Sequence, residues 1–239
     1  QNVTASGDVD GPDLVGGLVG QSRGTITDAT ASGKVTGDES VGGLIGDTGE
    51  NSVITNATAS GEVRGSETVG GLVGGADLNT RVRNVRASGD VSGANATGGL
   101  VGFVDDATTL TTAEASGSVT GSNAVGGLVG QNEGRITNAM ASGNVNGFNL
   151  TGGLVGFSDG DGMIANATAS GSVSGSDNVG GLVGQNNGTI TTAMASGNAE
   201  GKSDIGGLVG ANAGAVRNTI AFGTVSAGEF PGGLIGVHI

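Results

Sequence analysis

The amino-acid sequence predicts an all-β protein, a single parallel β-solenoid (β-helix) of about nine coils with 26 or 28 residues in each. Three observations predict it. A Gly-Gly-Leu-Val/Ile-Gly motif recurs nine times, an Ala-Ser-Gly-like triplet stands 11 residues before each copy, and small or apolar residues alternate with polar ones around each triplet. The Gly-Gly motifs begin at Gly16, Gly42, Gly70, Gly98, Gly126, Gly152, Gly180, Gly206 and Gly232.

The alternation predicts where the strands lie in each coil. From Ala29 to Thr36, small or apolar residues occupy every second position and polar residues occupy the others. A period of two is typical of a strand with one buried face. Before it stand an apolar column that includes Ile26 and a mostly Asn column that begins at Asp28. Asn tolerates unusual backbone angles, so we expect this column at a corner, and about three short strands in each coil.

The length of the repeat varies in only one connection. The segment from the triplet to Gly-Gly is constant, whereas the return to the next triplet takes 15 or 17 residues. The longer form follows Gly46, Gly74, Gly102 and Gly156. We therefore expect a loop that accepts two extra residues while the strands keep their register. A single coil cannot fold alone, because ordering each residue costs ~1–2 kcal/mol and only a few apolar side chains are buried in return.

Composition limits the functions that this chain can have. Its net charge of −13 should repel nucleic acid and anionic membranes, and suits a very salty setting or a surface that meets cations. It has no Cys, and its one His is His238, so catalytic triads and zinc sites are excluded. Nine copies of a glycine motif with no Lys-Ser/Thr after it do not indicate a phosphate-binding loop. We expect no enzyme activity and no cofactor, with Ca²⁺ as the alternative.

The longer connections carry the carboxylates that suggest calcium. Three of these connections follow one another in consecutive coils, so stacking would bring their acids together. Carboxylates from successive loops are suitable Ca²⁺ ligands, although an acidic, solvated rim is the simpler interpretation. The candidate calcium ligands are Asp47, Glu50, Asp77, Asp105, Asp106, Asp159 and Asp161.

A basic cluster in the third complete coil gives a second candidate site. Arg81, Arg83 and Arg86 stand at outward positions of an acidic chain, where they could recognise an anionic glycan. The alternative is ion pairing between coils, since Arg86 shares its column with Glu114. Asn-X-Ser/Thr sequons add candidate glycosylation sites, which are Asn2, Asn56, Asn95, Asn149, Asn166 and Asn187.

One pair of columns leaves two arrangements open. Leu44 and Ile45 are neighbours, yet both positions are apolar in every copy. If the strand is regular, one of them points outward and forms an exposed apolar stripe that invites lateral association. If the Gly-Gly pair bends the chain, both side chains reach the core.

These units resemble the GLUG repeat, which is named for its Gly-Leu-any-Gly core. The residues that carry the resemblance are Gly43-Leu44-Ile45-Gly46 and its eight counterparts, within a longer pattern such as the one from Gly180 to Ala193. GLUG repeats occur in bacterial and archaeal surface proteins, including adhesin-like chains and the repeat regions of some IgA-specific peptidases. The resemblance implies a surface-displayed repeat region and brings no catalytic residues.

The sequence therefore predicts one solenoid domain over residues 1–239, expected to be a segment of a longer chain or a filament subunit. We expect a non-enzymatic, extracellular structural or adhesive module that forms a rod, stalk or filament on a cell surface. Its expected partners are other copies of itself or extracellular polymers, without nucleic acid and without membrane insertion. The alternative is a calcium- or glycan-binding surface module that uses coils two to four.

Overall fold

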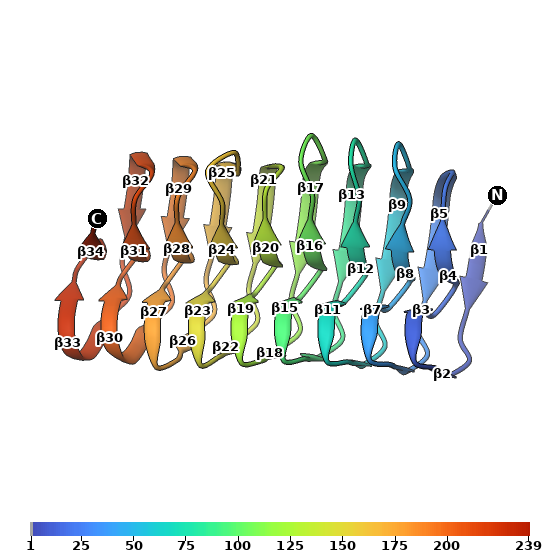
Figure 1. The fold of residues 1–239 in the computed structure, drawn as a ribbon, viewed down its shortest axis with the longest axis horizontal. Helices are drawn as coiled ribbons and strands as arrows, with labels where there is room; N and C mark the ends of the chain where they lie inside the picture. The colour runs from blue at the N-terminus through green and yellow to red at the C-terminus, as the bar shows by residue number, and fades with distance from the viewer. Residues whose placement is uncertain (1) are drawn as a thin grey trace.

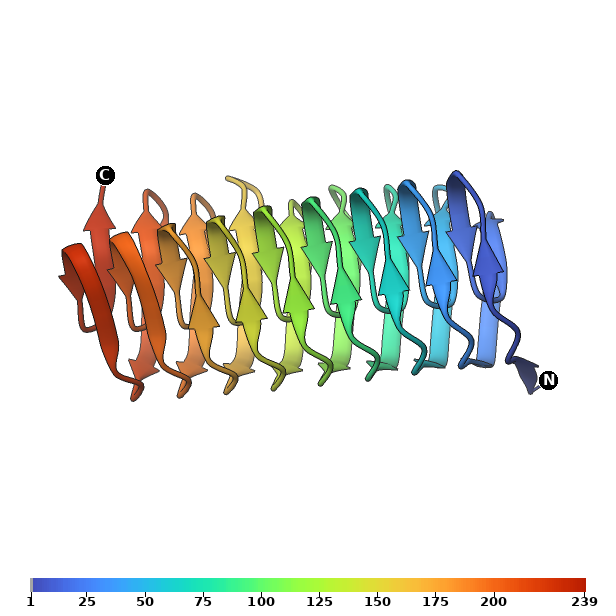
Figure 2. The same ribbon diagram turned by 90° about the horizontal axis from the view of Figure 1, so that it is seen from below.

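A computed structural model describes residues 2–239 and confirms the predicted architecture (Figure 1). All regular elements of this part of the chain are β-strands, and they wind into a rod with the two termini at opposite ends. Seen from below, successive coils lie side by side with the same slant along the whole rod (Figure 2). Residues 2–239 contain no helix of the length and apolar character that crossing a membrane requires.

One complete coil shows the plan of all the others. It consists of β5 (Thr25–Ala31), β6 (Val35–Thr36), β7 (Glu39–Gly42) and β8 (Ile45–Thr48). These four segments belong to three sheets, because the β6-type and β7-type strands join in one sheet through the longer strands near the C-terminus. The prediction of about three strands in each coil therefore holds at the level of sheets.

The strands of each sheet follow one another along the rod. The first sheet contains β1 (Val3–Ala5), β5, β9 (Val53–Ala59), β13 (Arg81–Ala87), β17 (Thr109–Ala115), β21 (Arg135–Ala141), β25 (Met163–Ala169), β29 (Thr189–Ala195) and β32 (Ala215–Ala221). The third sheet contains β4 (Val19–Ser22), β8, β12 (Val73–Ala76), β16 (Val101–Val104), β20 (Val129–Asn132), β24 (Val155–Ser158), β28 (Val183–Asn186), β31 (Val209–Asn212) and β34 (Ile235–His238).

The second sheet holds two rows of short strands. The two-residue row consists of β2 (Val9–Asp10), β6, β10 (Val63–Arg64), β14 (Val91–Ser92), β18 (Val119–Thr120), β22 (Val145–Asn146) and β26 (Val173–Ser174). The four-residue row consists of β3 (Asp13–Gly16), β7, β11 (Glu67–Gly70), β15 (Asn95–Gly98), β19 (Asn123–Gly126), β23 (Asn149–Gly152) and β27 (Asp177–Gly180). Two eight-residue strands span both rows, β30 (Ala199–Gly206) and β33 (Val225–Gly232).

The register confirms that the longer connections do not disturb the strands. All pairs are parallel, and Arg81 of β13 stands between Val53 of β9 and Thr109 of β17. Thr109 in turn pairs with Arg135, although the connection before Arg135 is two residues shorter. The extra residues therefore stay in the loop between the third and first sheets, as the constant block of the repeat predicts.

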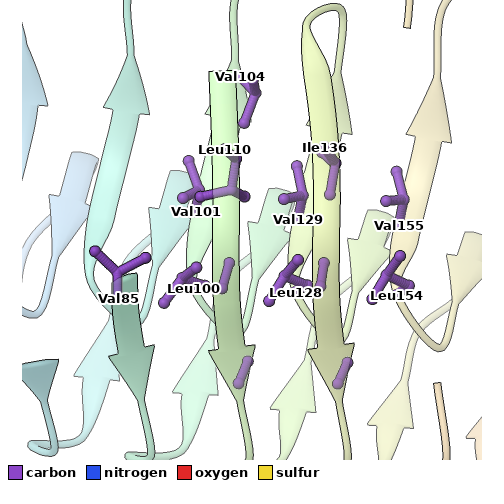
Figure 3. Close-up of a cluster of buried hydrophobic side chains, with 14 of the residues drawn as sticks. Val85, Leu100, Val101, Val104, Leu110, Leu128, Val129, Ile136, Leu154 and Val155 are labelled. Atoms are coloured by element: carbon purple, nitrogen blue, oxygen red, sulfur yellow. The ribbon is translucent and has the colours of Figure 1, made fainter. Parts of the chain in front are cut away.

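The main core lies between the first and third sheets. It is built from the Ile and Ala columns of the first sheet and the Leu and Val columns that follow Gly-Gly. Leu100, Leu128 and Leu154 form one row in Figure 3, and the valines that follow them form a second row. Smaller Val-rich clusters fill the bend of the second sheet. A core of short side chains in regular rows explains how a chain with 2% aromatic residues stays closely packed.

The structure decides between the two arrangements of Leu44 and Ile45. Both side chains are 0% exposed, as are their counterparts in the other interior coils. Gly43 and Leu44 form a bend between β7 and β8, so the two neighbours belong to differently directed segments. The described coils therefore carry no outward apolar stripe at this position.

The glycines of the motif permit contact between backbones. A methyl group added at Gly98 would overlap the carbonyl oxygen of Val101, and one added at Gly99 would overlap the carbonyl oxygen of Gly127 in the next coil. At Gly102 the added carbon would lie 2.7 Å from the backbone nitrogen of Val69 in the preceding coil. No side chain of any size fits between these segments, which explains the motif.

The residues of the Asn column adopt the unusual backbone angles that we expected, but they lie inside strands and not at corners between strands. All its members have positive φ, for example 54° at Asn84 and 54° at Thr112. They lie inside the long strands of the first sheet, where the pairing register skips them, and they bend each strand instead of ending it. Their amides form a partial ladder, in which Asn84 Nδ2 donates to Asn56 Oδ1 at 2.6 Å and Asn56 Nδ2 donates to Asp28 Oδ1 at 2.9 Å.

We expect Gly102→Ala to lower the thermal midpoint strongly, because the methyl group meets backbone atoms that cannot move independently. The expected loss is roughly 1–3 kcal/mol, typical of overpacking. The matched control is Gly24→Ala, where the added carbon has nothing within 4 Å. Thermal unfolding followed by circular dichroism compares the two, and equal midpoints would contradict the role given to backbone contact.

We expect Thr112→Asn to raise the stability of the rod. Thr112 is β-branched and has positive φ, and it interrupts the amide column between Asn84 and Asn138. Asn removes most of a strain of ~1 kcal/mol and supplies the missing amide. Thr109→Asn is the control, since Thr109 has an ordinary extended backbone in the same strand and should gain nothing. The measurement is again the thermal midpoint, and a fall for Thr112→Asn would contradict the interpretation.

Candidate functional site

The longer connections form one edge of the rod. In Figure 1 the loops that lead into β9, β13, β17 and β25 project beyond the neighbouring loops. Each runs from a strand of the third sheet to a strand of the first sheet, as in the segment from Gly49 to Ser52 between β8 and β9. Because these loops follow one another along the axis, side chains at equivalent positions line up.

Stacking brings part of the predicted acidic set into one row. Asp77, Asp105 and Asp159 begin their loops at equivalent positions, and Glu133 fills the coil between the last two. The backbone nitrogens confirm the equivalence, since Asp105 donates to Ala76, Glu133 to Val104 and Asp159 to Asn132, each carbonyl lying one coil earlier. The sequence prediction missed Glu133, because its coil has no insertion. Aligning the first residue of every loop would have found it.

Burial and the charges of neighbouring acids raise the pKa of two members of this row, Asp77 and Glu133. Burial raises the pKa of Asp77, and the charges of Asp105 and Glu50 raise it further. Burial also raises the pKa of Glu133, with added repulsion from Asp105 and Asp159. The remaining predicted acids, Asp106 and Asp161, project into solvent with Glu50.

Asp47 shows the largest effect on this edge. Burial and the charge of Asp77 raise the pKa of Asp47 to about 6. Its carboxylate occupies space left by a missing side chain, since a carbon added at Gly75 would lie 2.6 Å from Asp47 Oδ1. Gln21 Nε2 donates to the other oxygen at 3.3 Å.

Within residues 2–239, no group of three or more His, Cys, Asp or Glu side chains is placed to hold a metal ion. Of the predicted acids, Asp77, Asp105 and Asp159 lie in a row along the axis. Glu50, Asp106 and Asp161 project into solvent instead. Calcium binding by these loops stays a prediction from the sequence.

The three arginines do not form one patch. Arg81 and Arg83 are exposed on β13 before the bend at Asn84, and Arg86 lies beyond the bend. Arg86 Nη2 is 2.5 Å from Glu114 Oε1 in the next coil, which agrees with the predicted ion pairing. Lys34 and Glu62 form a second pair between coils at 3.7 Å. Such exposed pairs each contribute about 0–1 kcal/mol. Recognition of an anionic glycan by these arginines stays a prediction.

The sequons occupy three kinds of position. Asn2 and Asn95 are exposed, whereas Asn149 and Asn187 are partly covered. In the sequons that begin at Asn95 and Asn149, the hydroxyl-bearing residues Thr97 and Thr151 are fully buried. A modifying enzyme would therefore have to reach these two sites before the coil closes.

The other two sequons, at Asn56 and Asn166, belong to the amide column. Asn56 Nδ2 donates to Asp28, and Asn166 Nδ2 donates to Asn138 Oδ1 at 3.3 Å. Attachment of a glycan would use the nitrogen that makes these bonds. Glycosylation at all six positions stays a prediction.

The bend at the amide column also creates a groove that the sequence did not predict. Two hollows of about 470 Å³ and 410 Å³ lie along it, the first across four coils and the second across the next three. We call this surface the ladder groove. One wall is the amide column, with Asn56, Asn84, Thr112, Asn138, Asn166, Thr192 and Asn218. The facing wall carries Thr58, Arg86, Glu114, Met140, Thr168, Met194 and Ile220.

Comparison with known families identifies the repeat. The model of the GLUG motif matches residues 11–36, 37–64, 65–92, 121–146 and 149–174, which together make up more than half of the chain. The chain belongs to the GLUG motif family. Each matched GLUG unit includes one β6-type strand and one β7-type strand or its equivalent, so the family pattern follows the structural coil. No curated protein and no solved structure matches the chain.

The acidic edge of this GLUG solenoid generates a pH prediction. The pKa of Asp47 is raised from 3.8 to about 6 by folding, so the folded chain binds more protons than the unfolded chain between these values. Stability from this residue is therefore present at low pH and is lost as the pH rises through about 6.

We expect Asp47→Asn to be more stable than the parent at pH 7 and nearly equal to it at pH 4. Because the side chain is only partly covered, solvent screening should keep the gain below ~1 kcal/mol. Asp161→Asn, at an exposed carboxylate of the same edge of the rod, is the control. Thermal midpoints at several pH values test this, and an equal gain at both pH values would contradict it.

Proposed function

We propose that this chain is a non-enzymatic structural and adhesive module that is displayed outside the cell. The observation that carries the proposal is the unbroken stack, in which the first and third sheets each contain nine parallel strands. The main core runs through these coils from Ala29 to Val209 as one cluster. Such an array works as a stiff spacer whose length is set by the number of repeats.

Charge supports a place away from nucleic acid and anionic membranes. A net charge of −13 disfavours contact with both. The resemblance to repeats of bacterial and archaeal surface proteins supports a place outside the cell. The proposed partners are extracellular polymers or other copies of the chain.

The spacer role is tested by removing one repeat in register. Deletion of residues 121–146 joins Thr120, the last residue of β18, to Gly147, which occupies the position of Gly121 in the repeat. We expect the shortened chain to fold with the same circular dichroism spectrum and to lose ~4.8 Å of length, the spacing of neighbouring strands. Small-angle X-ray scattering measures the length. Loss of folding, or an unchanged length, would contradict a modular rod.

The location is tested on intact cells of the organism that encodes the chain. Protease added outside should remove the protein, while a cytoplasmic marker stays intact as the control. Protection of the chain until the cells are lysed would contradict display at the surface.

A further inference from the structure

The ladder groove consists of two hollows that follow one another along the rod, with the Arg86–Glu114 ion pair among their lining residues. It runs parallel to the axis across seven coils, from the coil of Asn56 to the coil of Asn218. Its cause is the positive φ of the amide-column residues, which bend the strands of the first sheet from β5 to β32 at the same level. A ligand that fills it must be long and narrow, and must lie along the rod.

The two sides of the groove differ in chemistry. The amide wall keeps free hydrogen-bonding capacity, because a ladder bond such as that from Asn84 to Asn56 uses one of the two amide hydrogens. The floor and the facing wall contribute aliphatic carbon, including Ala167, Met194 and a half-exposed Met140. Hydroxyl groups on one edge of a ligand and C–H groups on its face would match these two surfaces.

The groove is electrically neutral on a strongly acidic rod. Arg86 and Glu114 are the charged side chains among its lining residues, and they form an ion pair with each other. The other acids of the rod lie outside the lining of the groove, many of them along the loop edge. A neutral lining disfavours charged ligands, because neither sign of charge would find a free partner in it.

The spacing of the coils distinguishes two classes of neutral polymer. Equivalent positions of the amide column, which hold Asn in five coils of the groove and Thr in two, recur at about 4.8 Å, the distance between neighbouring strands. An extended peptide advances by ~3.3 Å per residue and falls out of step with this repeat. One residue of a linear β-linked hexose polymer advances by about as much as one coil, so successive sugars can each meet one Asn or Thr of the amide column.

We propose that the ladder groove binds a linear, uncharged polysaccharide that lies parallel to the axis of the rod. This names the partner class of the adhesive role proposed above, and it rests on that role. The sugar rings place hydroxyl groups against the amide column, and C–H faces against the aliphatic side chains of Met140, Met194 and Ile220.

Matched methionine variants test the proposal. The probes are cello-, manno- and xylo-oligosaccharides of several lengths, with alginate fragments and an uncharged peptide as competitors of other classes. Met140→Arg and Met194→Arg place a charged side chain in the groove. Met163→Arg is the control, since Met163 is exposed on the same sheet but stands before the bend, outside the groove.

We expect isothermal titration to show binding of at least one neutral oligosaccharide, with affinity that rises with its length. Each groove variant should weaken binding about tenfold, and the control should change it less than about twofold. In nuclear magnetic resonance spectra, the side-chain amide signals of Asn84, Asn138 and Asn166 should shift on addition of the sugar, which tests the site without any substitution.

Three results would overturn the proposal. They are failure of every neutral oligosaccharide to bind, binding that the groove variants and the control affect equally, and preferential binding of alginate or of the peptide. None of these results would bear on the spacer role, because the scattering measurement on the repeat deletion decides that role separately.

Discussion

The rest of the structure depends on close contact between backbones at the Gly-Gly-Leu-Val-Gly bend. Gly98 lies against the carbonyl group of Val101 in its own coil, and Gly99 lies against Gly127 in the next. With no side chain between them, the second and third sheets meet closely, and the bend turns both Leu100 and Val101 into the core. This one local arrangement closes each coil and sets the distance across which the Ile and Ala columns of the first sheet must reach. Small side chains suffice because the walls are already near each other.

Stacking makes every position of the coil an environment that is repeated along the rod. Inward columns accept little variation, so Leu stands at the position of Leu44 in all nine copies of the motif. Outward columns vary freely, and the wall that faces the amide column contains Thr, Arg, Glu, Met and Ile. A second column with positive φ, which includes Ser40, Leu150 and Phe230, shows that stacking also imposes strained backbone angles on residues that rarely adopt them. The repeat therefore fixes the scaffold and leaves variation for the surface.

The periodicity of the sequence predicted those features that depend on the register between strands. The fold class, the elastic loop, the buried alternation after Ala29 and the pairing of Arg86 with Glu114 all follow from aligned columns. Features that depend on the direction of the backbone did not follow. The sequence could not place Ile45, because that required the bend at Gly43 and Leu44. It placed the Asn column at a corner between strands and so missed the groove, which exists because the bend falls inside the strand. Glu133 was missed because it stands in a shorter connection, where no insertion marks the loop.

The neutral groove extends over several coils, and this suggests how its affinity for a polymer would arise. A single coil offers a polymer only one amide or hydroxyl and a few aliphatic contacts, which is too little for measurable binding. Seven coils offer a series of such contacts, and once one sugar is bound, the next is held at a high effective concentration over the next coil. Affinity would then grow with ligand length and with repeat number, so that adding coils extends the rod and strengthens its hold on a polymer at the same time. The acidic edge keeps such a rod apart from anionic surfaces by electrostatic repulsion while the neutral groove stays open to uncharged chains.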